Sequence, residues 1–394
     1  MINKFSIGNF KSFKYVTFDL KPLTVLSGIN GSGKSTLCQS MLLMKQHFVN
    51  AYGEKDSISL NNDYVQLGRI QDIWHHGAEE ENMYFVAESR DSRFIYNVEV
   101  DQNNLTNDFV KGNSRLEPLD DVTEDNLIAR QLKDIKYLTA ERVGPRAVQL
   151  KNDHMVRIEK HVGIAGEYTN SFLDLHGSEI LDLEYRSHLD APSESLYAQS
   201  VYWLKSICQN INLNTTSHQE IDQVSVSFQF DTSLGKSQNL RPTNVGFGIS
   251  YVMPVIVSCL AAKPGDILII DTPEAHLHPK GQFIMGELIA CTAADGVQVI
   301  VETHSDHVIN GIRMQTIKEV LQPDDSQFYY FELGAGSGYE SPVTIVHNPK
   351  INSSGQFDHW PRGFFDEWSY ALNEMLKLRA DTPTSERNID IERE

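Results

Sequence analysis

The chain has 394 residues with globular proportions of hydrophobic (40%) and charged (22%) residues, and its formal net charge is −19. This length and composition allow one large domain or two modest ones, with a sizeable core. The negative charge argues against a protein that grips nucleic acid over its whole surface, because such proteins are usually basic. Any nucleic-acid contact is therefore expected to be local or indirect.

The chain carries no signal of membrane insertion or export. No apolar run is long enough for a membrane span, and the N-terminus lacks the apolar stretch and cleavage site of a signal peptide. The four cysteines are scattered without paired spacing, which argues against a disulfide framework and a zinc cluster. These features predict a cytoplasmic location and no membrane partner.

The N-terminal part predicts strands followed by a glycine-rich turn and a helix. Short apolar–polar patterns over 5–18 and a dense apolar run over 23–26 precede the turn, and 36–48 has helical composition. The segments 83–89 and 94–100 predict two strands of an antiparallel β-meander joined by Asp-Ser-Arg. A further strand is expected to run into the Gly-Pro turn of 135–146.

The rest of the chain alternates between helical and strand-like segments. Residues 151–222 are predicted to be a mainly helical insertion, clearest over 195–211, and 222–231 alternates as a strand does. Helices are expected over 248–262 and 282–293, and buried strands before Asp271 and over 297–303. The predicted organisation is an N-terminal lobe (1–150), the insertion (151–222), a C-terminal lobe (223–350), and a C-terminal segment (351–394) that frays from Lys377.

One motif indicates nucleotide binding. Gly28 to Ser35 matches G-x-x-x-x-G-K-[ST], after an apolar strand and before a helix. The glycines let backbone N–H groups surround phosphate oxygens, and the helix N-terminus adds to the attraction. Lys34 is expected to reach the β- and γ-phosphates and Ser35 to bind Mg²⁺. The candidate ATP-binding residues here are Asn30, Gly31, Ser32, Gly33, Lys34, Ser35 and Thr36.

The second half of the site is predicted at the end of the apolar strand Ile267 to Asp271. An acid at this position holds a magnesium-bound water in P-loop ATPases. Lys34 and Asp271 are 237 residues apart, whereas compact P-loop folds place these motifs much closer. The separation indicates a split nucleotide-binding core.

Four segments together resemble a known group of ATPases. GINGSGKST, NVGFGIS, IIDTPEAHLHPKGQ and ETHSDHVINGIR are similar to the RecF/OLD/SMC-head branch of ABC-type ATPases. More narrowly, the chain resembles bacterial AAA-family ATPases with EAHLHP after this strand, including the ATPase subunit of Septu-type anti-phage systems. The resemblance implies an α/β, ABC/SMC-head-like P-loop fold with a split core, a β-meander and a helical insertion. It also implies ATP and Mg²⁺ as cofactors, and a head-to-head dimer that sandwiches two ATP molecules.

The same resemblance assigns roles to further residues. The loop 244–250 is expected to complete the partner's ATP site, through Asn244, Gly246, Gly248 and Ser250. His304 matches the switch histidine that senses the γ-phosphate. The acid that usually follows Asp271 and activates water is replaced by Thr272, so Glu274 of EAHLHP becomes the candidate base. The alternative is that Glu274 braces the dimer interface and hydrolysis is slow.

Several other residues remain open. The resemblance to ABC heads also implies a loop glutamine that contacts Mg²⁺, and Gln66 and Gln71 are the two candidates. Gln71 is slightly preferred. The predicted metal-binding residues are therefore Ser35, Asp271 and Gln71. The resemblance places the turn containing Glu141, Arg142 and Arg146 near the nucleotide or the interface. Four histidines have spacings that metal sites also use: His276, His278, His304 and His307. An aromatic group near the C-terminus is expected to be core or a docking surface: Trp360, Phe364, Phe365 and Trp368.

The resemblance implies an ATP-hydrolysing regulatory subunit. Its partner would be a separate effector, a nuclease of the HNH type, in anti-phage defence. The alternative is a stand-alone RecF-like ATPase acting on DNA in repair or recombination. Ninety residues follow His304 without an Asp-x-Asp motif after a strand, so no nuclease is expected within the chain.

Overall fold

A parallel sheet forms the centre of the computed structural model, which describes residues 1–49, 57–118, 127–334, 343–361, 363–364 and 367–381. The strand order is β16-β15-β3-β14-β13-β8, and only β16 at the edge is antiparallel to its neighbour. Every residue of β14 is buried, which explains why its centre, Val299 to Val301, is continuously apolar rather than alternating. The strands are β3 (Leu23–Gly28), β8 (Lys136–Leu138), β13 (Ile267–Asp271), β14 (Gln298–Glu302), β15 (Ser326–Gly334) and β16 (Val343–His347).

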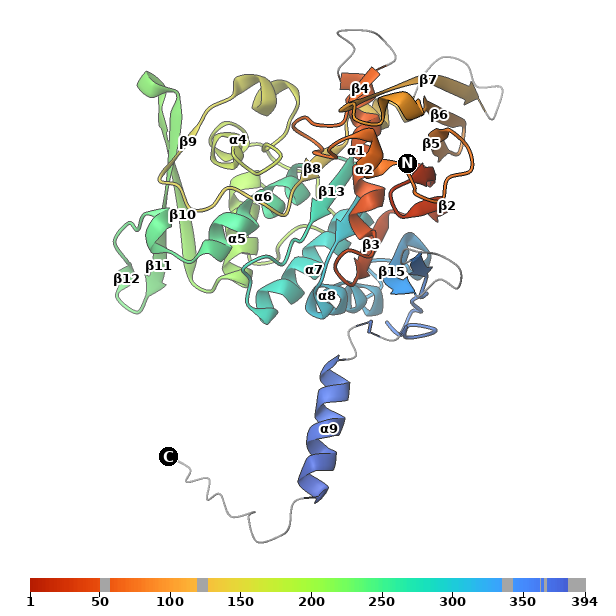
Figure 1. Ribbon diagram of the computed structural model, residues 1–394. Coiled ribbons are helices and arrows are strands. Elements are labelled where there is room, and N and C mark those ends of the chain that lie inside the picture. Colours follow the sequence, from red (N-terminus) through yellow and green to blue (C-terminus); the bar gives the residue numbers. More distant parts are fainter. Residues whose placement is uncertain (50–56, 119–126, 335–342, 362, 365–366, 382–394) are drawn as a thin grey trace.

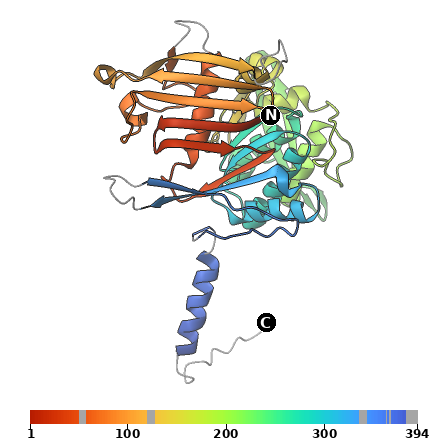
Figure 2. The ribbon, with the colours of Figure 1, turned by 90° about the vertical axis from the view of Figure 1, so that its right-hand side faces the viewer.

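A second, antiparallel sheet lies beside the first and confirms the predicted meander (Figure 2). Its order is β2-β1-β5-β6-β7-β4, and Arg90 and Asp91 separate β5 from β6. Burial alternates along β5, so that one face packs into a core shared with helix α1 (Lys34–Val49). The strands are β1 (Ile2–Phe10), β2 (Phe13–Asp19), β4 (Ser57–Ser59), β5 (Asn82–Ser89), β6 (Ser92–Glu99) and β7 (Phe109–Pro118).

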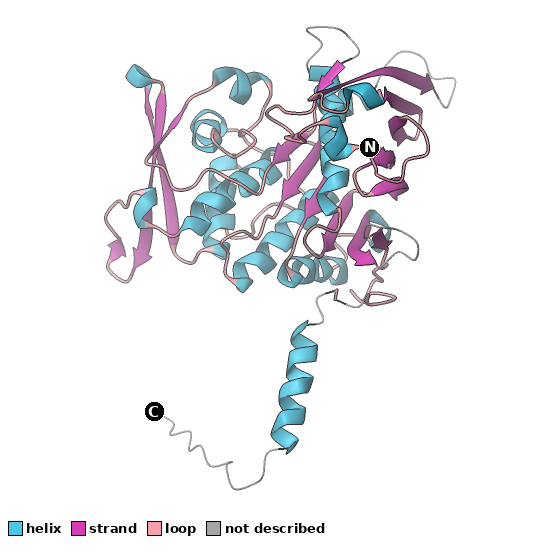
Figure 3. Ribbon diagram, in the orientation of Figure 1, coloured by secondary structure: helices cyan, strands magenta, loops and turns pink. Residues whose placement is uncertain are grey.

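Helices cover the other face of the parallel sheet (Figures 1 and 3). The predicted helices over 248–262 and 282–293 are confirmed as α6 and α7, whose apolar residues join one large core with β13 and β14. These helices are α4 (Thr169–His176), α5 (Leu196–Ile207), α6 (Phe247–Ala261), α7 (Pro279–Ala294) and α8 (Asp306–Ile317); the shorter α2 (Ile70–Ile73) and α3 (Leu127–Lys133) lie elsewhere.

The segment 151–222 is less helical than the sequence predicts. It contains α4, α5 and one wider turn at His154–Ile158, but residues 211–218 form a strand, β10 (Ile211–His218). The helical pattern ends at Ile207 because the following residues, rich in Thr and Asn, favour strand pairing over a helix. The small sheet also contains β9 (Val148–Leu150), β11 (Gln223–Thr232) and β12 (Gly235–Lys236).

The loop between α4 and α5 is fixed by a buried arginine. Arg186 is 1% exposed, and its Nε donates to Asp295 Oδ2 at 2.6 Å. Its Nη1 donates to the carbonyl oxygens of Cys259 and Ala262 at 2.5 and 2.9 Å. The guanidinium therefore joins this irregular loop to the ends of α6 and α7, because a buried charge needs such partners.

The C-terminal helix α9 (Glu367–Asp381) extends away from the body (Figure 1). Fraying is predicted from Lys377, but Lys377 to Asp381 belong to α9; residues 382–394 lie outside the described residues. Of the aromatic group, Phe364 is fully buried against Trp360 and Phe357 at ring distances of 4.9 and 5.3 Å, which confirms the core interpretation for Phe364, whereas Trp360 is 44% exposed. The side chains of Phe365 and Trp368 lie outside the described residues. Among the described helices, none is both long and apolar enough to cross a membrane.

His161 gives the folded state a testable dependence on pH. The backbone N–H groups of Tyr137 and Gly163 point at its Nε2 and Nδ1, at 3.2 and 2.9 Å. Burial, reinforced by Lys45 and Lys136, lowers the pKa of His161 from 6.5 to about 3. The folded state therefore binds fewer protons than the unfolded state below pH 6.5, and stability is lost as the pH falls.

We expect the free energy of unfolding to decrease by about 2 kcal/mol between pH 7 and pH 5 through this group alone, since each pH unit below the unfolded pKa contributes about 1.4 kcal/mol. Urea unfolding at both pH values checks this. His161→Gln should show a smaller loss than the wild type, and His307→Gln, at a partly exposed position, should show the same loss as the wild type. An unchanged pH dependence in His161→Gln would contradict the assignment.

Candidate functional site

The glycine-rich turn forms a phosphate-binding loop between β3 and α1. Gly28 ends β3 and Lys34 begins α1. A side chain at Gly28 would meet the carbonyl oxygen of Phe331 at 2.1 Å, and Gly33 has a φ of +97°, so both positions need glycine. The Lys34 Nζ donates to the carbonyl oxygens of Gly28 and Ile29 at 3.0 and 2.7 Å. The ammonium is thus held within the loop, at the N-terminus of a 16-residue helix.

Two carboxylates meet this loop at the carboxyl edge of the parallel sheet. Asp271 ends β13 and Glu302 ends β14, and the two residues are paired in register. Because β14 lies between β3 and β13, Glu302 is next to the phosphate-binding loop. The Ser35 hydroxyl donates to Glu302 Oε1 at 3.0 Å. The structure therefore brings together Lys34, Ser35 and Asp271, as the sequence predicts, and adds Glu302.

Glu302 is a site residue that reasoning from the sequence misses. It lies in the segment ETHSDHVINGIR, where the sequence pattern marks it only as the end of a strand. The available signal is its place two residues before His304. That signal becomes informative only when the strand order is known, because the order places β14 beside the phosphate-binding loop.

The electrostatics of this edge favour a bound cation. Burial, together with the neighbouring Asp271, raises the pKa of Glu302 to about 7. Burial also lowers the pKa of Lys34, although Glu302 and Asp271 oppose this. Carboxylate and hydroxyl oxygens are the ligands that Mg²⁺ prefers, so Ser35, Asp271 and Glu302 fit this ion.

A cavity of about 350 Å³ opens in front of these groups. Its lining includes Ser35, Asp271, Glu302, Glu141 and Gln66, but not Gln71. The structure thus places Gln66, rather than the preferred Gln71, beside Ser35 and Asp271. Gln71 lies exposed in α2 with its backbone N–H bonded to the Leu105 carbonyl at 3.0 Å, away from the cavity. The loop before α2 folds back on itself, with Leu67 N–H bonded to Leu60 O at 2.8 Å, and this places Gln66 at the cavity.

Glu274 lies beside the site, held by the loop that follows β14. Thr272 and His276 both have positive φ, 48° and 61°, so the chain after Asp271 turns sharply. The backbone N–H of His304 donates to Glu274 Oε1 at 2.7 Å. The Oε2 of Glu274 is buried with no hydrogen-bond partner among the described residues. Burial also raises the pKa of Glu274. One oxygen thus fixes the carboxylate and the other remains available to accept a proton.

Arg142 braces the end of β13. It is 3% exposed and its guanidinium donates to the carbonyl oxygens of Asp271 and Thr272, the latter at 3.2 Å. Burial lowers the pKa of Arg142 to about 10. The turn after β8 therefore lies at the site, through Arg142 and through Glu141 in the cavity wall. Arg146 is exposed.

The loop 244–250 lies outside this cavity. α6 begins at Phe247, and a Cβ added at Gly246, just before it, would have no described atom within 4 Å beyond its chain neighbours. Phe247 is 59% exposed. By contrast, a side chain at Gly248 would meet the His276 carbonyl at 2.6 Å. None of these residues lines the cavity with Ser35 and Asp271.

The histidines after β13 and β14 shape turns. The His276 ring lies 4.5 Å from the Tyr251 ring, and His278 precedes α7 with Nδ1 accepting from Lys280 N–H at 3.4 Å. His304 has an exposed side chain, and partial desolvation with nearby Lys34 lowers its pKa. Within the described ranges, no three His, Cys, Asp or Glu side chains gather as a metal site.

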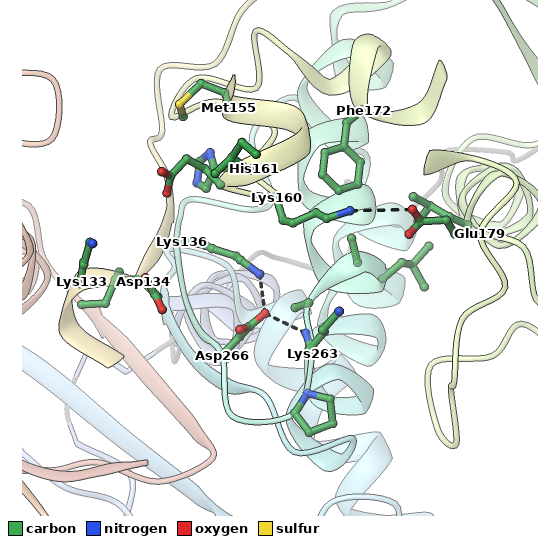
Figure 4. Close-up of a pocket in the computed structure, with 18 of the residues that line it drawn as sticks. Lys133, Asp134, Lys136, Met155, Lys160, His161, Phe172, Glu179, Lys263 and Asp266 are labelled. Carbon is green, nitrogen blue, oxygen red and sulfur yellow. Dashed lines mark hydrogen bonds and ion pairs between the residues drawn. The ribbon is translucent and has the colours of Figure 1, made fainter. Parts of the chain in front are cut away.

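A larger cavity, of about 1030 Å³, lies at the other end of α1 (Figure 4). Two of its lysines lie beside acids: Lys136 pairs with Asp266, and Lys160 lies 3.8 Å from Glu179. Lys45 Nζ donates to the carbonyl of Lys133 at 2.5 Å, at the end of α3. The C-terminal ends of α1, α3 and α6 all contribute to the lining, and lysines favour such ends. The charges here therefore stabilise the fold.

Comparison with known proteins agrees with this geometry. Residues 23–310 match the family model described as "AAA domain, putative AbiEii toxin, Type IV TA system". Residues 321–375 match "Protein of unknown function (DUF3696)". No curated protein matches the chain.

A solved structure of an SMC head shares the fold, and two further SMC heads are more distantly similar. An SmcHead bound to the C-winged helix domain of ScpA has a TM-score of 0.53 at 14% identity, over 89% of this chain and 98% of that chain. A head with an extended coiled coil, bound to the C-terminal domain of ScpA derived from Pyrococcus furiosus, scores 0.48 at 12% identity, over 96% and 99%. The SMC head domain from Thermotoga maritima scores 0.43 at 11% identity, over 89% and 99%.

The predicted fold class is confirmed: this is an α/β, ABC/SMC-head-like P-loop ATPase fold. The first family model matches well over half of the chain, including β3, α1, β13 and β14. The protein therefore belongs to the AAA-domain ATPase family whose model is described as putative AbiEii toxin of type IV toxin–antitoxin systems.

Proposed function

We propose that the protein binds ATP with Mg²⁺, hydrolyses it, and uses the nucleotide state to control a separate effector protein. The observation that carries the proposal is the meeting of the phosphate-binding loop with Asp271, Glu302 and Glu274 at one edge of the sheet. This arrangement combines a phosphate cradle, oxygen ligands for a cation and a buried carboxylate with one oxygen that has no partner among the described residues.

Each residue has a role in this proposal. The backbone from Asn30 to Thr36 surrounds the phosphates, and Lys34 turns from its loop carbonyls toward the β- and γ-phosphates. Ser35 and Asp271 hold Mg²⁺, which when bound neutralises charge on the phosphates. Glu274 orients the attacking water and accepts its proton, and Arg142 keeps Asp271 in place.

Two copies of the chain pair head to head, and the loop 244–250 acts on the partner's ATP. Asn244, Gly246, Gly248 and Ser250 lie outside the chain's own cavity, and the exposed N-terminus of α6 suits a γ-phosphate supplied from another protomer. His304, exposed beside Lys34 and Asp271, senses that phosphate. Dimer closure and nucleotide state are thereby coupled.

Gly246 gives a sharp test of action between protomers. The Cβ of Gly246→Val has open space around it, and the φ of this residue is an ordinary −56°, so the variant should fold normally. We expect it to bind ATP as the wild-type monomer does but to hydrolyse it at least about 10-fold more slowly, because the added methyl groups obstruct a closely approaching phosphate. Weaker ATP binding by the isolated monomer would argue that the loop acts within its own chain.

The effector is proposed to be a nuclease in anti-phage defence. Support comes from the resemblance to Septu-type ATPase subunits and from a family description that refers to a toxin system. The net charge of −19 disfavours direct DNA binding as the main activity. ATP then stabilises the closed dimer, which restrains or positions the effector.

Co-expression with the native genomic neighbours tests this function. The tagged chain is purified with and without ATP, and the mass of the complex is measured by native mass spectrometry. A nuclease that co-purifies in a defined ratio, with an assembly that changes with ATP, is the expected result. A chain that is recovered alone and whose ATPase rate rises with DNA would instead support the RecF-like function.

A further inference from the structure

We propose that Glu302 holds the divalent cation together with Ser35 and Asp271, so that the site contains two carboxylates rather than one. The inference rests on the proposed binding of ATP with Mg²⁺ and adds a residue to it. The expected ligand is a divalent cation that prefers oxygen, such as Mg²⁺ or Mn²⁺.

The first argument is geometric. Register-paired residues on neighbouring parallel strands point to the same side of a sheet and lie about 5 Å apart. Asp271 and Glu302 are such a pair, and Leu26 of β3 is the register partner of Glu302 on its other side. Both carboxylates therefore emerge beside the phosphate-binding loop. Both also line the 350 Å³ cavity with Ser35.

The second argument is the contact that Glu302 makes. Its Oε1 accepts the hydroxyl proton of Ser35, the residue whose oxygen is expected to bind the cation. A carboxylate within 3.0 Å of that oxygen lies within reach of any cation bound to it. Since Glu302 is only 5% exposed, bulk water supplies little of the solvation that its charge requires.

The third argument is the balance of charge. The guanidinium of Arg142 donates its hydrogen bonds to the carbonyl oxygens of Asp271 and Thr272. The positive charge that faces the carboxylates of Asp271 and Glu302 from the phosphate-binding loop is therefore that of Lys34. ATP phosphates would add further negative charge at the same place. A divalent cation between the carboxylates and the phosphates resolves this repulsion, whereas a site without one leaves like charges together in a low-dielectric setting.

A purely structural role for Glu302 makes a different prediction. If Glu302 only orients the Ser35 hydroxyl, then Glu302→Gln should behave as the wild type, because the amide oxygen still accepts that hydrogen bond. If Glu302 holds the cation, the same variant should lose metal affinity, because a neutral amide is a weaker ligand than a carboxylate. The variant thus separates charge from hydrogen bonding.

The experiment measures metal and nucleotide binding separately on the full chain. Mn²⁺ binding is followed by electron paramagnetic resonance with a non-hydrolysable ATP analogue present, and binding of the analogue alone is measured in EDTA. For Glu302→Gln we expect the affinity for Mn²⁺ to fall about 10-fold to 100-fold, as for other metal-supporting residues. The affinity for the ATP analogue in EDTA should stay the same or increase. Glu287→Gln on α7, which loses a carboxylate bound to Gln315 and Lys318 at the end of α8, is the matched control.

The outcomes are distinguishable. An unchanged Mn²⁺ affinity in Glu302→Gln, with normal analogue binding, overturns the role of Glu302 and leaves ATP binding intact. A wild type that binds no analogue with or without metal overturns the proposed function instead. If Glu302→Gln unfolds, as judged by circular dichroism, Glu302→Asp is used. It retains the charge but shortens the side chain, and it should weaken Mn²⁺ binding less than Asp271→Asn does.

Discussion

Lys34→Ala is expected to abolish ATP binding at physiological concentrations. Lys34 is 4% exposed, and its ammonium is held within the phosphate-binding loop by the carbonyl oxygens of Gly28 and Ile29. Charge-assisted bonds from such a group to phosphate are among the strongest polar contacts in proteins, so we expect a loss of at least about 100-fold in affinity. Isothermal titration calorimetry with a non-hydrolysable ATP analogue measures this loss.

The control for this variant is Lys263→Ala. Lys263 is exposed and lies at the cavity on the far end of α1 from the loop, so its removal should leave nucleotide affinity unchanged. Circular dichroism establishes that both variants are folded. Tight ATP binding by a folded Lys34→Ala protein would be incompatible with a nucleotide site at this loop.

Glu274→Gln is expected to slow hydrolysis and to trap the ATP-bound dimer. One carboxylate oxygen is fixed by the His304 N–H at 2.7 Å, and the other is buried without a partner among the described residues. Burial raises the pKa of Glu274, which brings it closer to the working pH of a general base. Because loss of a general base typically costs about 10² to 10⁴ in rate, turnover should fall by that factor while ATP affinity is retained.

Two measurements separate the possible roles of Glu274. Single-turnover ATPase assays report the chemical step, and analytical ultracentrifugation with ATP reports the dimer. A slow variant with an abundant dimer supports the role of base. An unchanged rate removes Glu274 from that role, and a dimer that weakens while the chemical step persists supports the alternative that Glu274 braces the interface. Glu287→Gln again serves as the control.

Local sequence patterns were sufficient for much of the fold. The phosphate-binding loop is eight contiguous residues, and its glycine positions follow from backbone sterics alone, as the φ of Gly33 and the close contact of Gly28 show. The meander strands β5 and β6 and the helices α6 and α7 follow from periodicity and burial. Strand β10 does not follow from periodicity, because its pairing with β11 overrides the helical pattern that precedes it.

The sequence by itself therefore determined that the chain has a phosphate-binding loop and an acidic strand end in a split core. Only the tertiary structure decided which groups join them. Ser35 and Glu302 are 267 positions apart, and they meet because β14 lies between β3 and β13. Gln66 rather than Gln71 lines the cavity because a loop folds back before α2. Strand order and loop closure are set by long-range packing, so they cannot be predicted from residue periodicity.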